Sequence, residues 1–178
     1  MKILGLYGLW VYFIVFDFSL TLKMMSVCVF SMDEREKKII GLAMKKEDMA
    51  YDYYVSIAKK TKSGNLREFF ANLSLQELRH KELLRLFLEH GDFFRAKESA
   101  ARKYPEDFDV MSGLSSTSDM GNLASSIKEA IERENRSYLM YKELYDESSD
   151  GKVKELFFYL SEEELRHIER LKSVYRNI

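Results

Sequence analysis

Apolar residues recur at three- and four-residue steps through most of the chain after Met32, a pattern that predicts long amphipathic helices. The pattern is clear in the second predicted helix, whose apolar face carries Leu66, Phe69, Phe70, Leu73, Leu84 and Phe87. The chain has one proline, Pro105, so these stretches are long and unbroken. We place helices at residues 33–61, 65–90, 120–148 and 152–176. At 1.5 Å per residue, they form an all-α four-helix bundle roughly 40 Å long.

The predicted turns divide these helices into two hairpins. Ser63-Gly64 and Asp150-Gly151 are expected to be tight breaks, because glycine can adopt the left-handed conformation that follows a helix. His90 immediately precedes Gly91, and we interpret it as part of a helix C-terminal cap.

Residues 91–119 form the one non-repeated insertion between the hairpins, and they include the polar run 115–119. At almost 30 residues this connection can run the length of the bundle, so the second and third helices would be parallel. Four aromatic residues are expected to attach the crossover to the bundle: Phe93, Phe94, Tyr104 and Phe108.

The two hairpins are copies of one another. Residues 39–90 align with 126–177 at a constant offset of 87, and sixteen of the fifty-two aligned pairs are identical. Both copies carry one glutamate followed later by a Glu-x-x-His motif, and these pairs are Glu47 and Glu134, Glu77 and Glu164, and His80 and His167. The second motif lies in the strings S-L-Q-E-L-R-H and S-E-E-E-L-R-H.

These six side chains have the chemistry of a site for two metal ions. Residues three apart on a helix project from one face, so Glu77 and His80 can reach the same point in the core. Each buried carboxylate without a counter-charge would cost several kcal/mol, and two divalent cations would balance the four carboxylates. Two carboxylates can bridge the ions, with one terminal glutamate and one histidine for each. Oxygen and imidazole donors without sulfur suit iron or manganese and, less selectively, zinc.

A less specific interpretation exists for each signal. A single Glu-x-x-His on a charged helix is usually a solvated face, whereas two copies in register with an upstream glutamate favour metal binding. Tyr54 and Tyr141 follow Glu47 and Glu134 by seven residues. They are either ordinary core aromatics or hydrogen-bond partners of the ligand carboxylates.

Composition narrows the range of functions. Lys and Arg number 28 against 29 Asp and Glu, a formal charge of -1, which does not suggest a nucleic-acid partner. Cys28 is the single cysteine, so a disulfide framework and a four-thiolate metal module are excluded. This cysteine content is compatible with a reducing compartment, and we expect a cytoplasmic protein.

The first 31 residues form an apolar extension that precedes a domain at 32–178. Residues 3–16 are uncharged, Asp17 interrupts them, and apolar character then resumes to Phe30 except at Lys23. The segment 3–30 is either a membrane anchor or uncleaved signal, or the consequence of a start assigned upstream of Met32.

The segments A-x-x-x-E-x-x-x-Y-x-x-Y (43–54 and 130–141) and L-x-x-x-E-L-R-H (73–80 and 160–167) resemble those of rubrerythrins, ferritin-like di-iron carboxylate proteins. The resemblance implies that Glu77 and Glu164 bridge two irons, that Glu47 and Glu134 are terminal, and that His80 and His167 are nitrogen ligands. Two departures stand out. The chain lacks the four-cysteine rubredoxin module of classical rubrerythrins, and Ile131 occupies a position where they tend to carry an extra carboxylate.

Three functions remain open at this point. The first is a di-iron oxidoreductase that reduces hydrogen peroxide or dioxygen with electrons from a separate donor such as a rubredoxin. The second is a ferroxidase or iron-storage subunit, and the third is a structural bundle with adventitious zinc or no metal. No fifth helix is expected after His167, which favours a compact oligomer, and the resemblance suggests a homodimer.

Overall fold

The computed structural model describes residues 32–105 and 120–178, with side chains from residue 123 onward in the second range. These two ranges form five α-helices and no strand, so the all-α prediction is confirmed. The helices are α2 (Glu34–Lys60), α3 (Gly64–His90), α4 (Phe93–Lys103), α5 (Met120–Glu147) and α6 (Gly151–Arg176). The four long helices match their predicted bounds to within one residue. In the ranges described, no helix is both long and apolar enough to cross a lipid bilayer.

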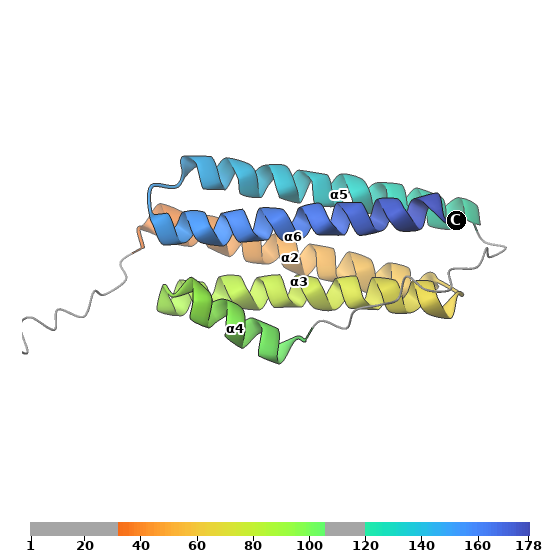
Figure 1. Ribbon diagram of the computed structural model, residues 1–178, viewed down its shortest axis with the longest axis horizontal. Coiled ribbons are helices and arrows are strands. Elements are labelled where there is room, and N and C mark those ends of the chain that lie inside the picture. The colour runs from red at the N-terminus through yellow and green to blue at the C-terminus, as the bar shows by residue number, and fades with distance from the viewer. Residues whose placement is uncertain (1–31, 106–119) are drawn as a thin grey trace, which may run out of the picture. The chain divides into compact units, whose positions relative to one another are not determined.

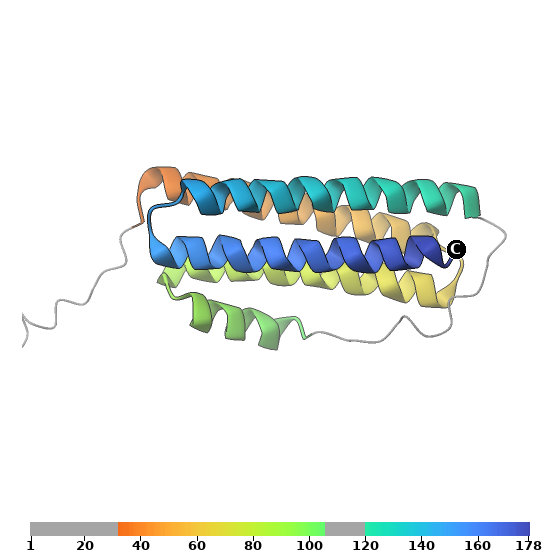
Figure 2. The same cartoon turned by 45° about the horizontal axis from the view of Figure 1, so that its top comes forward.

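The four long helices pack as two hairpins, α2 with α3 and α5 with α6 (Figure 1). The direction of the colours in Figures 1 and 2 shows that α3 and α5 run the same way along the bundle. This is the single-crossover arrangement predicted from the long insertion. Backbones approach closely within each hairpin, and α3 and α6 approach each other at fewer points. The space between the hairpins is therefore bridged by side chains, several of them polar.

The crossover contains a helix that the sequence pattern did not predict. Helix α4 begins after Asp92, whose carboxylate accepts a hydrogen bond from Arg95 N at 3.0 Å. Phe93 is buried and packs edge-on against Tyr159 of α6, with ring centroids 5.6 Å apart. The expectation for Phe94 was wrong, because it points away and is 70% exposed. The predictions for Phe108 and for residues 1–31 fall outside the residues described.

The predicted role of the turn glycines was also wrong. Gly64 and Gly151 are the first residues of α3 and α6, so neither follows a helix in the left-handed conformation. Asp150 caps α6 through its side chain, and the equivalent Ser63 precedes α3 without such a bond. Among the described glycines only Gly91 has a positive φ, 63°, and it ends α3 as predicted.

Apolar packing joins the hairpins at the end of the bundle that contains the α2–α3 turn. All four long helices contribute to this cluster, which comprises Tyr54, Ile57, Ala58, Leu66, Phe69, Phe70, Leu73, Ile127, Ala130, Leu171 and Val174. The cluster excludes water from one side of the polar groups at mid-bundle. Those groups consequently lie in a medium where unpaired charge is costly.

Candidate metal centre

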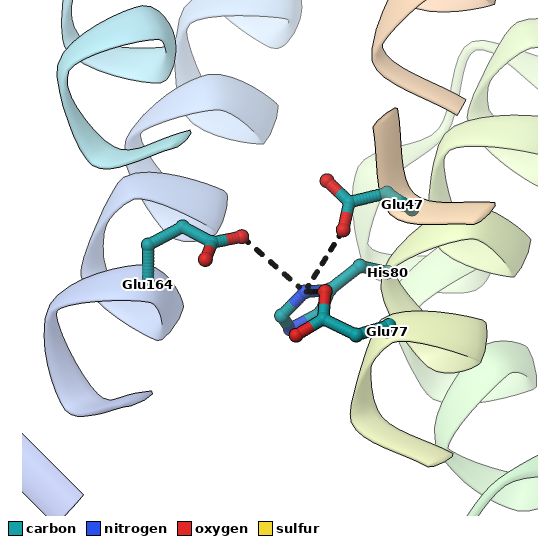
Figure 3. Close-up of side chains that lie close together, drawn as sticks. All are labelled: Glu47, Glu77, His80 and Glu164. Carbon is teal, nitrogen blue, oxygen red and sulfur yellow. Dashed lines mark ion pairs between the residues drawn. The ribbon is translucent and has the colours of Figure 1, made fainter. Parts of the chain in front are cut away.

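The six predicted ligands meet in the middle of the bundle. Glu47 comes from α2, Glu77 and His80 come from α3, and Glu164 comes from α6, with their polar ends turned toward one another (Figure 3). Glu134 on α5 and His167 on α6 complete the set. All six side chains are at most 2% exposed. The ligating types were identified from the sequence, and the structure brings all six together.

One group of potential ligands surrounds His80. Its Nδ1 lies 3.7 Å from Glu47 Oε2, 3.6 Å from Glu77 Oε2 and 3.7 Å from Glu164 Oε1. One ligand atom from each of these four residues lies within 4.8 Å of the others. The group could therefore hold a single metal ion.

The second group surrounds His167 and mirrors the first. Its Nδ1 lies 3.2 Å from Glu77 Oε1, 3.6 Å from Glu134 Oε2 and 3.8 Å from Glu164 Oε2. The imidazole rings of His80 and His167 are nearly parallel, with centroids 5.3 Å apart. The two groups are thus adjacent, and each is completed by a different terminal glutamate.

Glu77 and Glu164 belong to both groups, and each divides its two oxygens between them. Glu77 directs Oε2 toward His80 and Oε1 toward His167, while Glu164 directs Oε1 toward His80 and Oε2 toward His167. Metal bonds to nitrogen and oxygen of about 2.0–2.2 Å place neighbouring ligand atoms about 3.0–3.5 Å apart. The observed separations of 3.2–3.8 Å need only small side-chain movements to reach this range.

Two buried tyrosines hold the terminal glutamates, and each reaches across to the other repeat. The Tyr54 hydroxyl donates a hydrogen bond to Glu134 Oε1, and the Tyr141 hydroxyl donates one to Glu47 Oε1. In both glutamates the other oxygen, Oε2, faces the histidine of its group. Of the two interpretations of the tyrosines, the structure favours the hydrogen-bond partner. Each bond leaves one carboxylate oxygen free to bind a cation.

The outer nitrogen of His167 identifies a residue that the sequence interpretation missed. Gln76 Oε1 lies 3.1 Å from His167 Nε2 and accepts a hydrogen bond from Arg170 Nη1 at 2.9 Å. Arginine only donates, so the amide oxygen must face it, and His167 Nε2 must carry the proton shared with that oxygen. With Nε2 protonated, the lone pair of Nδ1 points at the carboxylates, where a cation would lie.

Glu163 was also missed, and it takes the equivalent place beside His80. Its Oε2 lies 3.9 Å from His80 Nε2 and 3.3 Å from Arg79 Nη2, and its Oε1 accepts a hydrogen bond from Arg166. The sequence contained a signal for both residues. Gln76 and Glu163 each precede a shared glutamate at matching positions of the two repeats.

Burial and mutual repulsion keep protons on part of the carboxylate group. Burial raises the pKa of Glu47 to about 7, and burial followed by repulsion from Glu134 raises the pKa of Glu164 well above its usual value. Burial alone would raise the pKa of Glu77 and lower that of His167. Their mutual attraction prevails, holding the pKa of Glu77 below its usual value and raising that of His167 to about 9. The protein groups alone therefore compete for positive charge at this site.

Several buried atoms of the site have no hydrogen-bond partner, which tests whether the residues suit metal ions. They include both carboxylate oxygens of Glu77 and of Glu164, Glu134 Oε2, and Nδ1 of both histidines. Unpaired buried polar atoms are rare because each loses its hydration. Here they converge on two points and combine oxygen with imidazole nitrogen, the donor set typical of iron and manganese sites. The residues fit a pair of metal ions.

A cavity of about 400 Å³ lies beside His80, between α3, α4 and α6. Arg79 and His80 line it from α3, Lys97 from α4 and Tyr159 from α6. Lys97 Nζ lies 4.1 Å from the centroid of the Tyr159 ring. The unpredicted helix α4 thus forms one wall of a space that borders the candidate site.

The model of the rubrerythrin family matches residues 38–175 of this chain. The chain belongs to the rubrerythrin family. Rubrerythrins typically bind two irons, and the buried groups around His80 and His167 are able to hold metal ions. No curated protein matches the sequence. A hypothetical protein from Pyrococcus furiosus is similar in fold, at 21% identity and a TM-score of 0.58, over 85% of this chain and 92% of that one.

Proposed function

We propose that this rubrerythrin-family chain is a di-iron oxidoreductase that reduces hydrogen peroxide, or dioxygen, with electrons from a separate donor protein. The observation that carries the proposal is the division of oxygens in Glu77 and Glu164, each of which offers one oxygen to each histidine group. Two carboxylates placed in this way suit a pair of ions held side by side. Iron is the metal proposed, since the family typically binds two irons.

The bound metals would supply Lewis acidity and electrons to the oxidant. The chain's own residues have defined tasks around them. Glu47 with His80, and Glu134 with His167, would complete the two positions, while Glu77 and Glu164 would be shared. Tyr54 and Tyr141 hold the terminal carboxylates in place. The apolar cluster next to the site excludes water from it.

The electrons must come from a partner in this proposal. Reduction of hydrogen peroxide to two waters consumes two electrons and two protons, which two ferrous ions supply once before they need re-reduction. The single cysteine of the chain cannot form a four-thiolate electron carrier. A separate electron carrier such as a rubredoxin is the proposed donor, and a compact homodimer is the proposed assembly.

Anaerobic loading with iron followed by rapid mixing tests the proposal. We expect two irons per chain, no mineral core, and faster oxidation of the ferrous protein by stoichiometric peroxide than by dioxygen. Glu77→Ala is the matched control and should abolish the fast phase. A shell of many subunits that loads hundreds of irons would favour storage instead. Recovery of zinc alone after anaerobic purification, with no iron uptake, would favour a structural bundle.

A further inference from the structure

The two histidines of the site have different partners behind them, although the residues in front of them are alike. His80 Nε2 faces the carboxylate of Glu163, and His167 Nε2 faces the amide oxygen of Gln76. Gln76 and Glu163 stand at equivalent positions of the two repeats. Both are buried, at 8% and 5% exposure. The difference between a charged and a neutral partner is therefore not removed by solvent.

We infer that Glu163 and Gln76 make the two metal positions unequal, so that the position completed by His80 binds its ion more tightly and fills first. The inference rests on the proposed function only in assuming that the site holds two metals. A metal-bound imidazole carries positive charge on its outer N–H group. A carboxylate behind that group stabilises the charge and strengthens the metal bond, and a neutral amide does so less.

The distances and the neighbouring arginines bear on the sign of this effect. Glu163 Oε2 lies 3.9 Å from His80 Nε2, which is longer than a hydrogen bond, whereas the contact of Gln76 with His167 is 3.1 Å. Charge attraction declines slowly with distance, so a buried anion still acts across this gap. Arg79 lies beside Glu163 and Arg170 beside Gln76, so each position has one such cation.

A second arginine, Arg166, also contacts Glu163, but its side chain is 50% exposed. Solvent and salt screen an exposed charge far more than a buried one. The carboxylate of Glu163 is only 6% exposed, so its own charge is screened much less. The anion behind His80 therefore remains the main difference between the two positions.

Histidine NMR during a zinc titration reads the order of filling directly, because the chain has three histidines and zinc is diamagnetic. In the full-length protein labelled with ¹⁵N-histidine, we expect the His80 ring signals to convert before those of His167. The two dissociation constants should differ at least about tenfold, since changes behind a metal ligand typically alter affinity 10–100-fold. Equal filling of both positions in the native chain would overturn the inference.

Reciprocal variants separate the cause from other differences between the repeats. Glu163→Gln should weaken the His80 position and Gln76→Glu should strengthen the His167 position, so each should abolish the preference. The double variant Gln76→Glu/Glu163→Gln should reverse it, and it keeps the number of carboxylates in the site region constant. Glu169→Gln, at an exposed site on α6, makes the same charge change and should leave the order intact.

The outcomes distinguish this inference from the proposed function. A preference that persists in Glu163→Gln and in the double variant would overturn the inference, whatever the activity. Ordered filling without faster oxidation by peroxide would support the inference and contradict the proposed function. Failure to bind any metal would overturn both. Should Glu163→Gln fail to fold, as judged by circular dichroism, Gln76→Glu and the double variant decide the question.

Discussion

The two helical hairpins of this protein present identical residues to the candidate site and different residues around it. Each hairpin offers one terminal glutamate, one shared glutamate, one histidine and one tyrosine. Behind the histidines the hairpins differ, with Gln76 in the first and Glu163 in the second. They differ again at the turns, where Ser63 of the first corresponds to Asp150 of the second.

This comparison separates positions where the site demands equality from positions where it does not. Two ions side by side require two similar groups of donors, so a repeat that changed one donor would leave the other repeat's residues unbalanced. Residues behind the donors act through them and change only the strength of binding. A repeated fold can therefore develop two unequal metal positions without any change of ligand.

The shared glutamates provide the strongest way to break the comparison. Glu77→Ala and Glu164→Ala should each impair both ions, because each removed carboxylate faces both histidines. We expect an affinity loss above the roughly 10–100-fold that follows from changes behind a ligand. Competition titrations with a chromophoric chelator would measure both steps.

The terminal glutamates are the matched controls for this experiment. Glu47→Ala should mainly weaken the ion near His80, and Glu134→Ala should mainly weaken the ion near His167. Full affinity at both positions in Glu77→Ala would rule out its bridging role.

Removal of the metals should weaken both hairpins together, because all four carboxylates lose their counter-charge. Binding stabilises the fold by about 2.7 kcal/mol when free metal is a hundredfold above its dissociation constant. For a chain of this size that corresponds to a melting temperature about 5–10 °C higher. Thermal melts with and without chelator check this. Identical melts for a preparation with two metals per chain would contradict the charge-balance argument.

The stabilisation by metal should grow with pH. The pKa of Glu47 rises from 4.5 to about 7 on folding, so its proton stabilises the metal-free fold below pH 4.5 and this contribution is lost by pH 7. The pKa of His167 rises from 6.5 to about 9, so its contribution is lost between those values. Both changes destabilise the metal-free fold as pH rises. The gap between metal-bound and metal-free melting temperatures should be wider at pH 8.5 than at pH 6, and a narrower gap would refute the prediction.

The tyrosines test whether the repeats are coupled across the site. Tyr54 holds Glu134, so Tyr54→Phe should weaken the position near His167, and Tyr141→Phe should weaken the position near His80. Each loss should be about 10–100-fold in metal affinity. Zinc titrations followed through the histidine signals would assign each loss to a position. Tyr51→Phe on α2 is the control, and a loss confined to the tyrosine's own repeat would contradict the crossed arrangement.

The sequence predicted the long helices well because their signals are local and repeated. Apolar periodicity over 26 or more residues leaves little freedom for the bounds of a helix such as α6. Helix α4 was missed because its eleven residues bury only Phe93, Ala96 and Ala100, too few positions for a clear period. The glycine turns were misassigned because the sequence does not distinguish a glycine that ends one helix from a glycine that begins the next.

The site was predictable in its donors and only partly in its surroundings. The repeat offset identified the six ligand candidates, because equal positions in two hairpins must meet at one level of the bundle. The crossing of Tyr54 to Glu134 depends on how the hairpins face one another, which is a tertiary property. Gln76 and Glu163 were missed because polar residues on a charged helix resemble its solvated face until their burial is known.

The turns should give the smallest difference between the hairpins, and one that is independent of metal. Asp150 accepts hydrogen bonds from the backbone N–H groups of Lys152 at 2.7 Å and Val153 at 3.1 Å, whereas Ser63 makes no such bond. Asp150→Ala should therefore cost about 1 kcal/mol of unfolding free energy, and Ser63→Ala should change it by only a few tenths. Ser63→Asp should give α3 the cap that α6 already has and add about 0.5–1 kcal/mol. Urea unfolding of the chelator-treated protein measures all three variants, and equal losses in Asp150→Ala and Ser63→Ala would show that the caps do not distinguish the repeats.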